Sequence, residues 1–128
     1  MKKRMISLTL ALAFILSLSL TASARWNGSI DGSVTLSYSG SSAVCSVTAD
    51  ANESTAKISA TMTLYRMNAN GSRTQVASWP LSGTGSINAK KYYSPTVSKT
   101  TYHLTVQGTV TDSSGSHTFS TYKQATCP

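Results

Sequence analysis

Carboxylates are scarce in this sequence, and the few present do not suggest catalysis. Four acidic residues occur among 128, and all stand at predicted turns or on predicted solvent-facing positions: Asp31, Asp50, Glu53 and Asp112. A hydrolytic triad needs an acid that orients a base next to a nucleophile, and no such set can be nominated. No serine occupies the strand-to-helix turn of a nucleophile elbow. We therefore expect a protein that is not an enzyme and uses no cofactor.

Long apolar runs are also lacking, except at the N-terminus. Basic residues 2–4 precede an apolar run over residues 6–20 and the small residues Ala22, Ser23 and Ala24, the pattern of a cleaved secretory signal. A membrane anchor is the alternative, but this run is short for a span and is interrupted by Ser and Thr. The sequence predicts a signal peptide over residues 1–24 and one secreted, extracellular domain over residues 25–128.

The charge that remains after removal of residues 1–24 is modest. Eight basic residues stand against four acidic ones, a net charge of +4, and the basic residues are scattered. This favours an anionic partner slightly and does not resemble the clustered basic footprint of a nucleic-acid-binding protein.

Cysteine is nearly absent, since Cys45 and Cys127 are the only two. Both fall in the predicted exported part, where oxidising conditions allow a disulfide to persist. We predict that they pair. The 81 residues between them imply a stabilisation of about 4.5 kcal/mol in the chain-entropy description, an upper-end figure.

Alternation of apolar and polar residues dominates the rest of the chain, which is typical of half-buried strands. Helical periodicity is not convincing anywhere after residue 24. Seven strands are predicted, the fifth of them weak and short: Ile30–Tyr38, Ala43–Ala49, Ala56–Leu64, Arg73–Trp79, Ile87–Tyr93, Tyr102–Val110 and His117–Lys123.

Turn residues separate these strands. Asn70-Gly71 predicts a type I′ hairpin turn, and the Gly/Ser-rich segment 81–86 predicts a linker that carries the chain between sheets. The fold class expected is all-β, an antiparallel immunoglobulin-like sandwich of about seven strands, with a small barrel as the alternative. A cis bond is conceivable at Trp79-Pro80 or Ser94-Pro95, and the sequence does not decide between them.

Two cations next to two aromatic rings make Lys90, Lys91, Tyr92 and Tyr93 the main candidate binding residues, with Trp26 as a further exposed aromatic. Such a group suits a sugar or an anionic polymer. The alternative is one buried ring and a basic strand edge that discourages aggregation.

Other residues carry weaker signals. Tyr65 is expected on an outer face and Trp79 in the core, while His103 is expected on the polar face of its strand, where burial would not tune it. His103, His117 and Asp112 match no metal-ligand spacing. Gly83 to Gly85 precedes no helix, so it predicts no phosphate site. The outward Thr and Ser residues suit either a binding array or simple β propensity.

The opening Gly32–Gly40, the Cys45 strand and the Leu64-Tyr65-Arg66 strand that ends at Asn70-Gly71 resemble small exported proteins of uncharacterised function from Gram-positive bacteria. The resemblance implies a secreted sandwich and no specific activity. Two functions are therefore expected from the whole sequence: binding of a cell-surface polymer or another extracellular protein, or, as the alternative, a small antibacterial or membrane-active effector.

Overall fold

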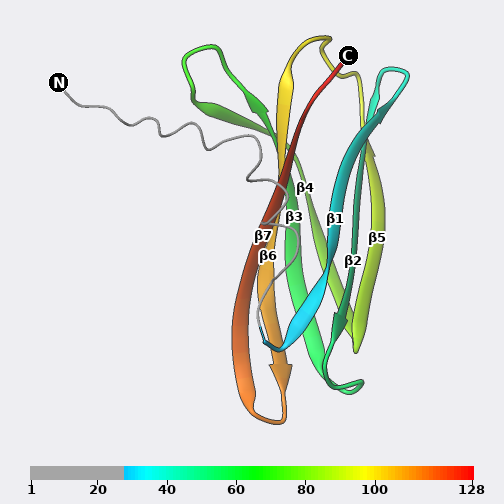
Figure 1. Cartoon of the computed structure of the whole chain (residues 1–128), viewed down its shortest axis with the longest axis vertical. Coiled ribbons are helices and arrows are strands. Elements are labelled where there is room, and N and C mark those ends of the chain that lie inside the picture. The colour runs from blue at the N-terminus through cyan, green and yellow to red at the C-terminus, as the bar shows by residue number, and fades with distance from the viewer. Residues whose placement is uncertain (1–27) are drawn as a thin grey trace, which may run out of the picture.

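The computed structural model describes residues 28–128, and its regular structure there is entirely β (Figure 1). The predicted signal peptide and Trp26 lie outside the described residues. The strands are β1 (Ile30–Ser39), β2 (Ser42–Ala51), β3 (Lys57–Met67), β4 (Arg73–Thr84), β5 (Ser86–Tyr93), β6 (Thr101–Asp112) and β7 (Gly115–Thr126). All seven predicted strands are therefore confirmed, most of them longer than expected.

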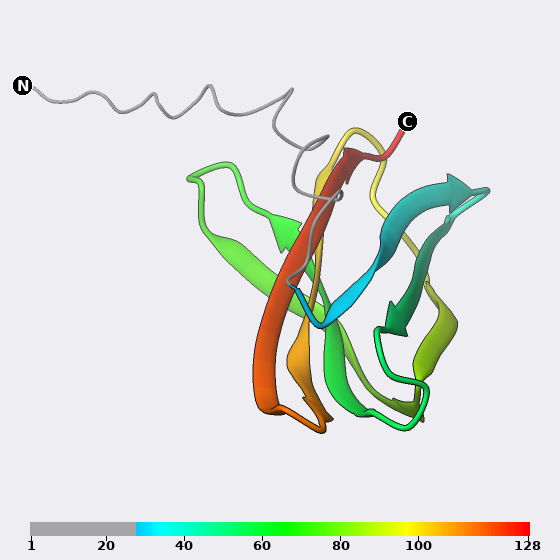
Figure 2. The ribbon, with the colours of Figure 1, turned by 60° about the horizontal axis from the view of Figure 1, so that its bottom comes forward.

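The strands form two separate antiparallel sheets, which confirms the predicted all-β class. One sheet has the order β1-β2-β5 and the other the order β4-β3-β6-β7. Figure 2 shows them as two layers, with the β3–β4 hairpin projecting beyond the layers at its tip. The C-terminus lies beside the β5–β6 connection, where the backbone of Cys127 bonds to Lys99 and Thr100.

The core lies between the layers and follows the alternation seen in the sequence. On β3, for example, Ile58, Met62 and Leu64 are buried, while Lys57, Ser59 and Thr61 are exposed. Thr63 departs from this pattern, since it is buried. Each fully buried side chain of this size contributes roughly 1.5–3 kcal/mol relative to exposure. The largest fully buried side chains come from both sheets: Tyr102, Ile30, Met62, Leu64, Leu104, Val47, Val106, Val110 and Cys45.

The predicted linker over residues 81–86 is wrong in part. β4 continues through Leu81 to Thr84, because Leu81 packs against the core while its neighbours remain exposed. The chain crosses to the other sheet at Gly85 alone, where φ is +78° and a Cβ would lie 2.6 Å from the carbonyl oxygen of Ser54.

The predicted type I′ turn at Asn70-Gly71 is also wrong. The loop spans residues 68–72, and only Gly71 in it has a positive φ. Asn68 explains the longer loop, since its side chain bonds to Ser72 and Thr74 and its backbone to Ser72 and Gly71. The Ser94-Pro95 peptide bond is cis.

Candidate functional site

Three aromatic side chains form a row across the outer face of the four-stranded sheet. Tyr65 of β3 pairs with His103 of β6, and His103 pairs in turn with Gln124 of β7. Tyr122 lies two residues before Gln124 and therefore points to the same outer face. The His103 and Tyr122 rings stack with centroids 4.9 Å apart and planes 14° apart, and the Tyr65 and His103 centroids are 6.4 Å apart. We call Tyr65, His103 and Tyr122 the ring row.

Arg73 of β4 extends the ring row to the edge of the sheet. Its guanidinium carbon lies 4.2 Å from the centre of the Tyr65 ring, which is a cation–π contact. A β-bulge brings it there: Leu64 pairs with Ala77 but Tyr65 with Gln75, so Val76 is an extra residue in β4. Because side chains alternate between faces, the extra residue turns Arg73 to the same face as Tyr65.

The neighbours of His103 alter its protonation. Burial under the two tyrosines is the main reason that the pKa of His103 is lowered, the nearby Arg73 charge lowers it further, and the hydrogen bond to Gln124 opposes both. That bond joins Nδ1 to Oε1 of Gln124 over 2.8 Å. The expectation that burial would not tune His103 is wrong: its strand face is polar as predicted, but the tyrosines cover the ring.

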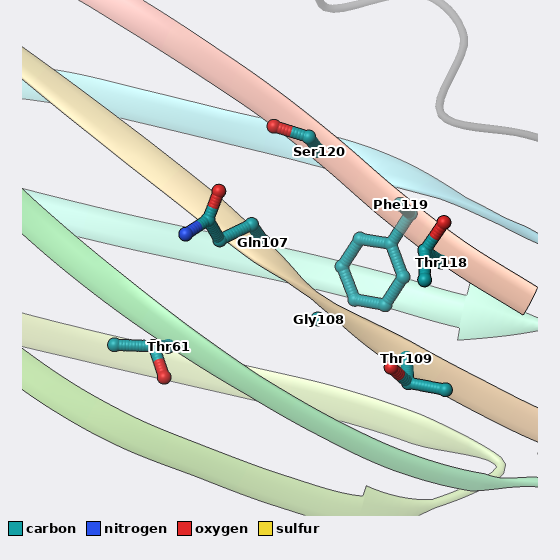
Figure 3. A pocket seen from close by; sticks show the side chains of 7 residues that line it. All are labelled: Thr61, Gln107, Gly108, Thr109, Thr118, Phe119 and Ser120. Atoms are coloured by element: carbon teal, nitrogen blue, oxygen red, sulfur yellow. The ribbon is translucent and has the colours of Figure 1, made fainter.

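A shallow hollow lies farther along the same face of the sheet. Its rim is uncharged and polar, and Figure 3 shows the Phe119 ring beside Gly108 between β6 and β7. Ser120 lies two residues from Tyr122 on β7, so the hollow and the ring row are contiguous. The lining residues are Thr61, Gln107, Gly108, Thr109, Thr118, Phe119 and Ser120.

The candidate stretch over residues 90–93 does not form one patch. Lys90 and Tyr92 are exposed on the outer face of the three-stranded sheet, and Tyr92 is 62% exposed. Lys91 and Tyr93 pair with the buried Cys45 and Ala43, so they point toward the interior side of the edge strand β5. The Tyr93 ring lies 6.3 Å from that of Tyr102. Part of the alternative expectation, a ring packed against the core, therefore holds.

The β6–β7 turn gathers a serine, a histidine and an aspartate without the geometry of a triad. Ser114 Oγ is 2.9 Å and Asp112 Oδ1 3.3 Å from the same atom, Nε2 of His117. In a catalytic triad, the histidine instead bonds to the nucleophile through one ring nitrogen and to the acid through the other. Hydrogen bonds from Ser114 are the main cause of the lowered pKa of Asp112. This cluster closes a turn.

The two cysteines are thiols in the structure, and a bond between them is not seen. Both are buried, Cys45 on β2 and Cys127 just after β7. Burial is the main cause of the raised pKa of the Tyr38 hydroxyl, and Cys127, Tyr102 and Cys45 raise that pKa further. Burial raises the pKa of Cys45 to about 12. The predicted pairing stays a prediction.

Within residues 28–128, no group of three His, Cys, Asp or Glu side chains is placed to hold a metal ion. Nor does that part of the chain contain a helix long and apolar enough to cross a membrane.

Sequence reasoning placed Tyr65 on an outer face, where it lies half-buried, but missed Arg73 and Tyr122. Tyr122 shares the outward parity of its strand, which was a usable signal. No such signal marked Arg73, because the face of the sheet to which its side chain points depends on the bulge at Val76.

No known protein family matches the chain, and no curated protein matches it.

Proposed function

We propose that this protein is a secreted, non-catalytic domain that binds a glycan polymer of the cell surface on the outer face of its four-stranded sheet. The observation that carries the proposal is the ring row, which continues into a hollow lined by hydroxyl and amide groups. Sugars present both apolar C–H faces and many hydroxyls, so a surface that recognises them needs rings beside uncharged hydrogen-bonding groups.

The ring row has the physical properties that such a surface requires. Tyrosine offers a large, amphipathic contact area at little cost in conformational entropy. Stacking on His103 fixes the Tyr122 ring further, and Gln124 holds His103. A ligand therefore meets rings that are already ordered, which lowers the entropic cost of binding.

The strand order supports an immunoglobulin-like type for this sandwich. In that fold the first, second and fifth strands share one sheet, and the third, sixth and seventh share the other. Both groupings occur here, with the fourth strand added to the second sheet beside β3. The added strand is the one that carries Arg73 to the ring row.

Export and disulfide formation are part of the proposal. The basic and apolar N-terminal residues support export. Cys45 of β2 and Cys127, just after β7, are both buried, and an oxidising compartment supports their pairing after export.

Co-sedimentation of the purified protein with insoluble cell-wall glycan tests the proposal. Tyr122→Ala should weaken sedimentation strongly, because it removes one ring of the stacked pair. Tyr92→Ala is the matched control, since it removes the most exposed aromatic of the other sheet.

Loss of sedimentation in Tyr92→Ala with Tyr122→Ala unaffected would move the site to β5 and contradict the proposal. Absence of sedimentation together with salt-sensitive leakage of anionic vesicles would favour the membrane-active alternative instead.

A further inference from the structure

Resting on the proposed function, we infer that the bound polymer is an acidic glycan and that the Arg73 guanidinium binds its carboxylate. The inference deepens the proposed function, because that proposal needs only a glycan of any charge.

Arg73 is held in place but keeps its hydrogen-bonding edge available. The side chain is exposed, and one face of its guanidinium lies against the Tyr65 ring. The ion pair found within residues 28–128 joins His117 to Asp112 and does not involve Arg73. A guanidinium is a planar fork whose N–H groups match the two oxygens of a carboxylate. Stacking on Tyr65 thus orders the group before a ligand arrives.

The protein's own carboxylates do not compete for this position. Asp31 and Asp50 face each other on the outer face of the three-stranded sheet, on the other side of the molecule. Glu53 accepts two hydrogen bonds from Ser113, and Asp112 is bound within the β6–β7 turn. The outer face of the four-stranded sheet therefore complements a negative charge.

The charge pattern of the face argues for isolated carboxylates and not for a dense polyanion. His103, next along the ring row, is biased toward its neutral form by its lowered pKa. Beyond it the hollow is lined by uncharged groups. The face carries two separate cations, Arg73 beside the ring row and Lys57 on the outward side of β3 beyond the hollow, with hydroxyl and amide groups between them. This spacing suits a chain in which each charge is a single carboxylate on a hydroxylated ring.

The dimensions allow a chain of several sugar rings. From His103 to Thr109 along β6, six residues at about 3.3 Å each span roughly 20 Å. Arg73 would bind a carboxylate at one end of this length, while the hollow at the other end contacts sugar hydroxyls.

The test measures the dissociation constants of two probes for the purified protein. One is an oligogalacturonate, and the other is the same oligosaccharide with its carboxylates reduced to primary alcohols. The oligogalacturonate should bind about tenfold more tightly or better, as expected for charge-assisted hydrogen bonds to a guanidinium. Arg73→Gln should remove that difference, and Arg73→Lys should restore only part of it because an ammonium lacks the fork.

Lys90→Gln serves as the control, since it removes the same charge from the opposite sheet. Equal binding of the two probes, or an Arg73→Gln variant that keeps the difference, would overturn this inference and leave the glycan site of the proposed function intact. Tighter binding of a poly(glycerol phosphate) chain than of the oligogalacturonate would also overturn it. Failure of both probes and of wall glycan to bind would overturn the proposed function as well.

Discussion

At the scale of single residues, His103 should make stability depend on pH. Because its pKa is lower in the folded than in the unfolded chain, the unfolded state binds more protons as the pH falls through the ordinary histidine range near 6.5. The free energy of unfolding should therefore fall between pH 7.5 and pH 5.5. Urea unfolding at both values measures it. His103→Gln should lose less stability over this interval, and an unchanged dependence in that variant would show that another group is responsible.

The outward positions of β3, β6 and β7 were predictable from the sequence only in part. Period-two alternation placed Tyr65 and His103 on outer faces, because a strand fixes the side to which each residue points. It did not reveal that Tyr122 stacks on His103, since that contact depends on the register between two strands. The protonation of His103 was mispredicted for the same reason.

At the scale of elements, β3 and β6 pair more closely than a side chain at Gly108 would permit. A Cβ there would lie 2.1 Å from the carbonyl oxygen of Ser59 and 2.6 Å from Cα of Ala60, both backbone atoms. Gly108 lies opposite Phe119 of β7, whose ring is buried beside it. Gly108 and Phe119, which line the hollow, are therefore also residues at which β6 pairs with its neighbouring strands.

Gly108→Ala should destabilise the fold by about 2 kcal/mol or more, since strand β6 must move away from β3. Gly71→Ala is the comparison, because its added Cβ meets open space and only the positive φ is strained, a cost of about 1 kcal/mol. Denaturant unfolding of the two variants checks the order. A larger loss in Gly71→Ala would contradict the close approach of the strands.

The alternative expectation for residues 90–93, a basic strand edge that discourages aggregation, extends to other edge strands of the molecule. Lys91 of β5 and Lys123 of β7 both point to the interior side of an edge strand, opposite the buried Cys45 and Leu104 respectively. Inward-pointing charges of this kind oppose pairing between edges of two molecules. β4, also at an edge, contains Pro80, which lacks a backbone donor.

Lys91→Val should therefore promote self-association, while Lys90→Val, which alters the outward side of the same strand, should have a smaller effect. Light scattering over a range of protein concentrations measures the difference. Equal behaviour of the two variants would show that the direction of Lys91 does not protect the edge.

The elements were largely predictable, but their ends were not. All seven strands follow from alternation, including the weak fifth. The extension of β4 to Thr84 was missed because Gly83 and the serines around it suggested a linker, although Leu81 packs against the core. The bulge at Val76 has no signature in the sequence, and it is what brings Arg73 into the candidate site.

At the scale of the whole molecule, the C-terminal end joins the two sheets. The Tyr38 hydroxyl of β1 donates to the carbonyl oxygen of Ala125 over 2.8 Å, and Ser98 donates to the carbonyl oxygen of Pro128. The Cys127 thiol donates to the Thr96 hydroxyl over 3.5 Å. A bond between Cys127 and Cys45 would make this closure covalent.

The exported protein should therefore have a mass lower by two hydrogen atoms than its reduced form. The reduced form and a Cys45→Ala/Cys127→Ala double variant should unfold at lower denaturant concentration. Their free energy of unfolding should be lower by at most about 4.5 kcal/mol in the chain-entropy description. Intact mass spectrometry and denaturant unfolding check both points. Two alkylatable thiols in the natively exported protein would contradict the predicted pairing.

Amide chemical-shift mapping with oligogalacturonate distinguishes the proposed binding surface, the outer face of the four-stranded sheet, from the outer face of the other sheet. We expect the shifts that change to belong to β3, β4, β6 and β7, concentrated around Tyr65, Arg73, His103 and Tyr122 and extending to Gln107 and Ser120. Changes confined to β5 and its neighbour β2 would place the binding surface on the other sheet and contradict the account.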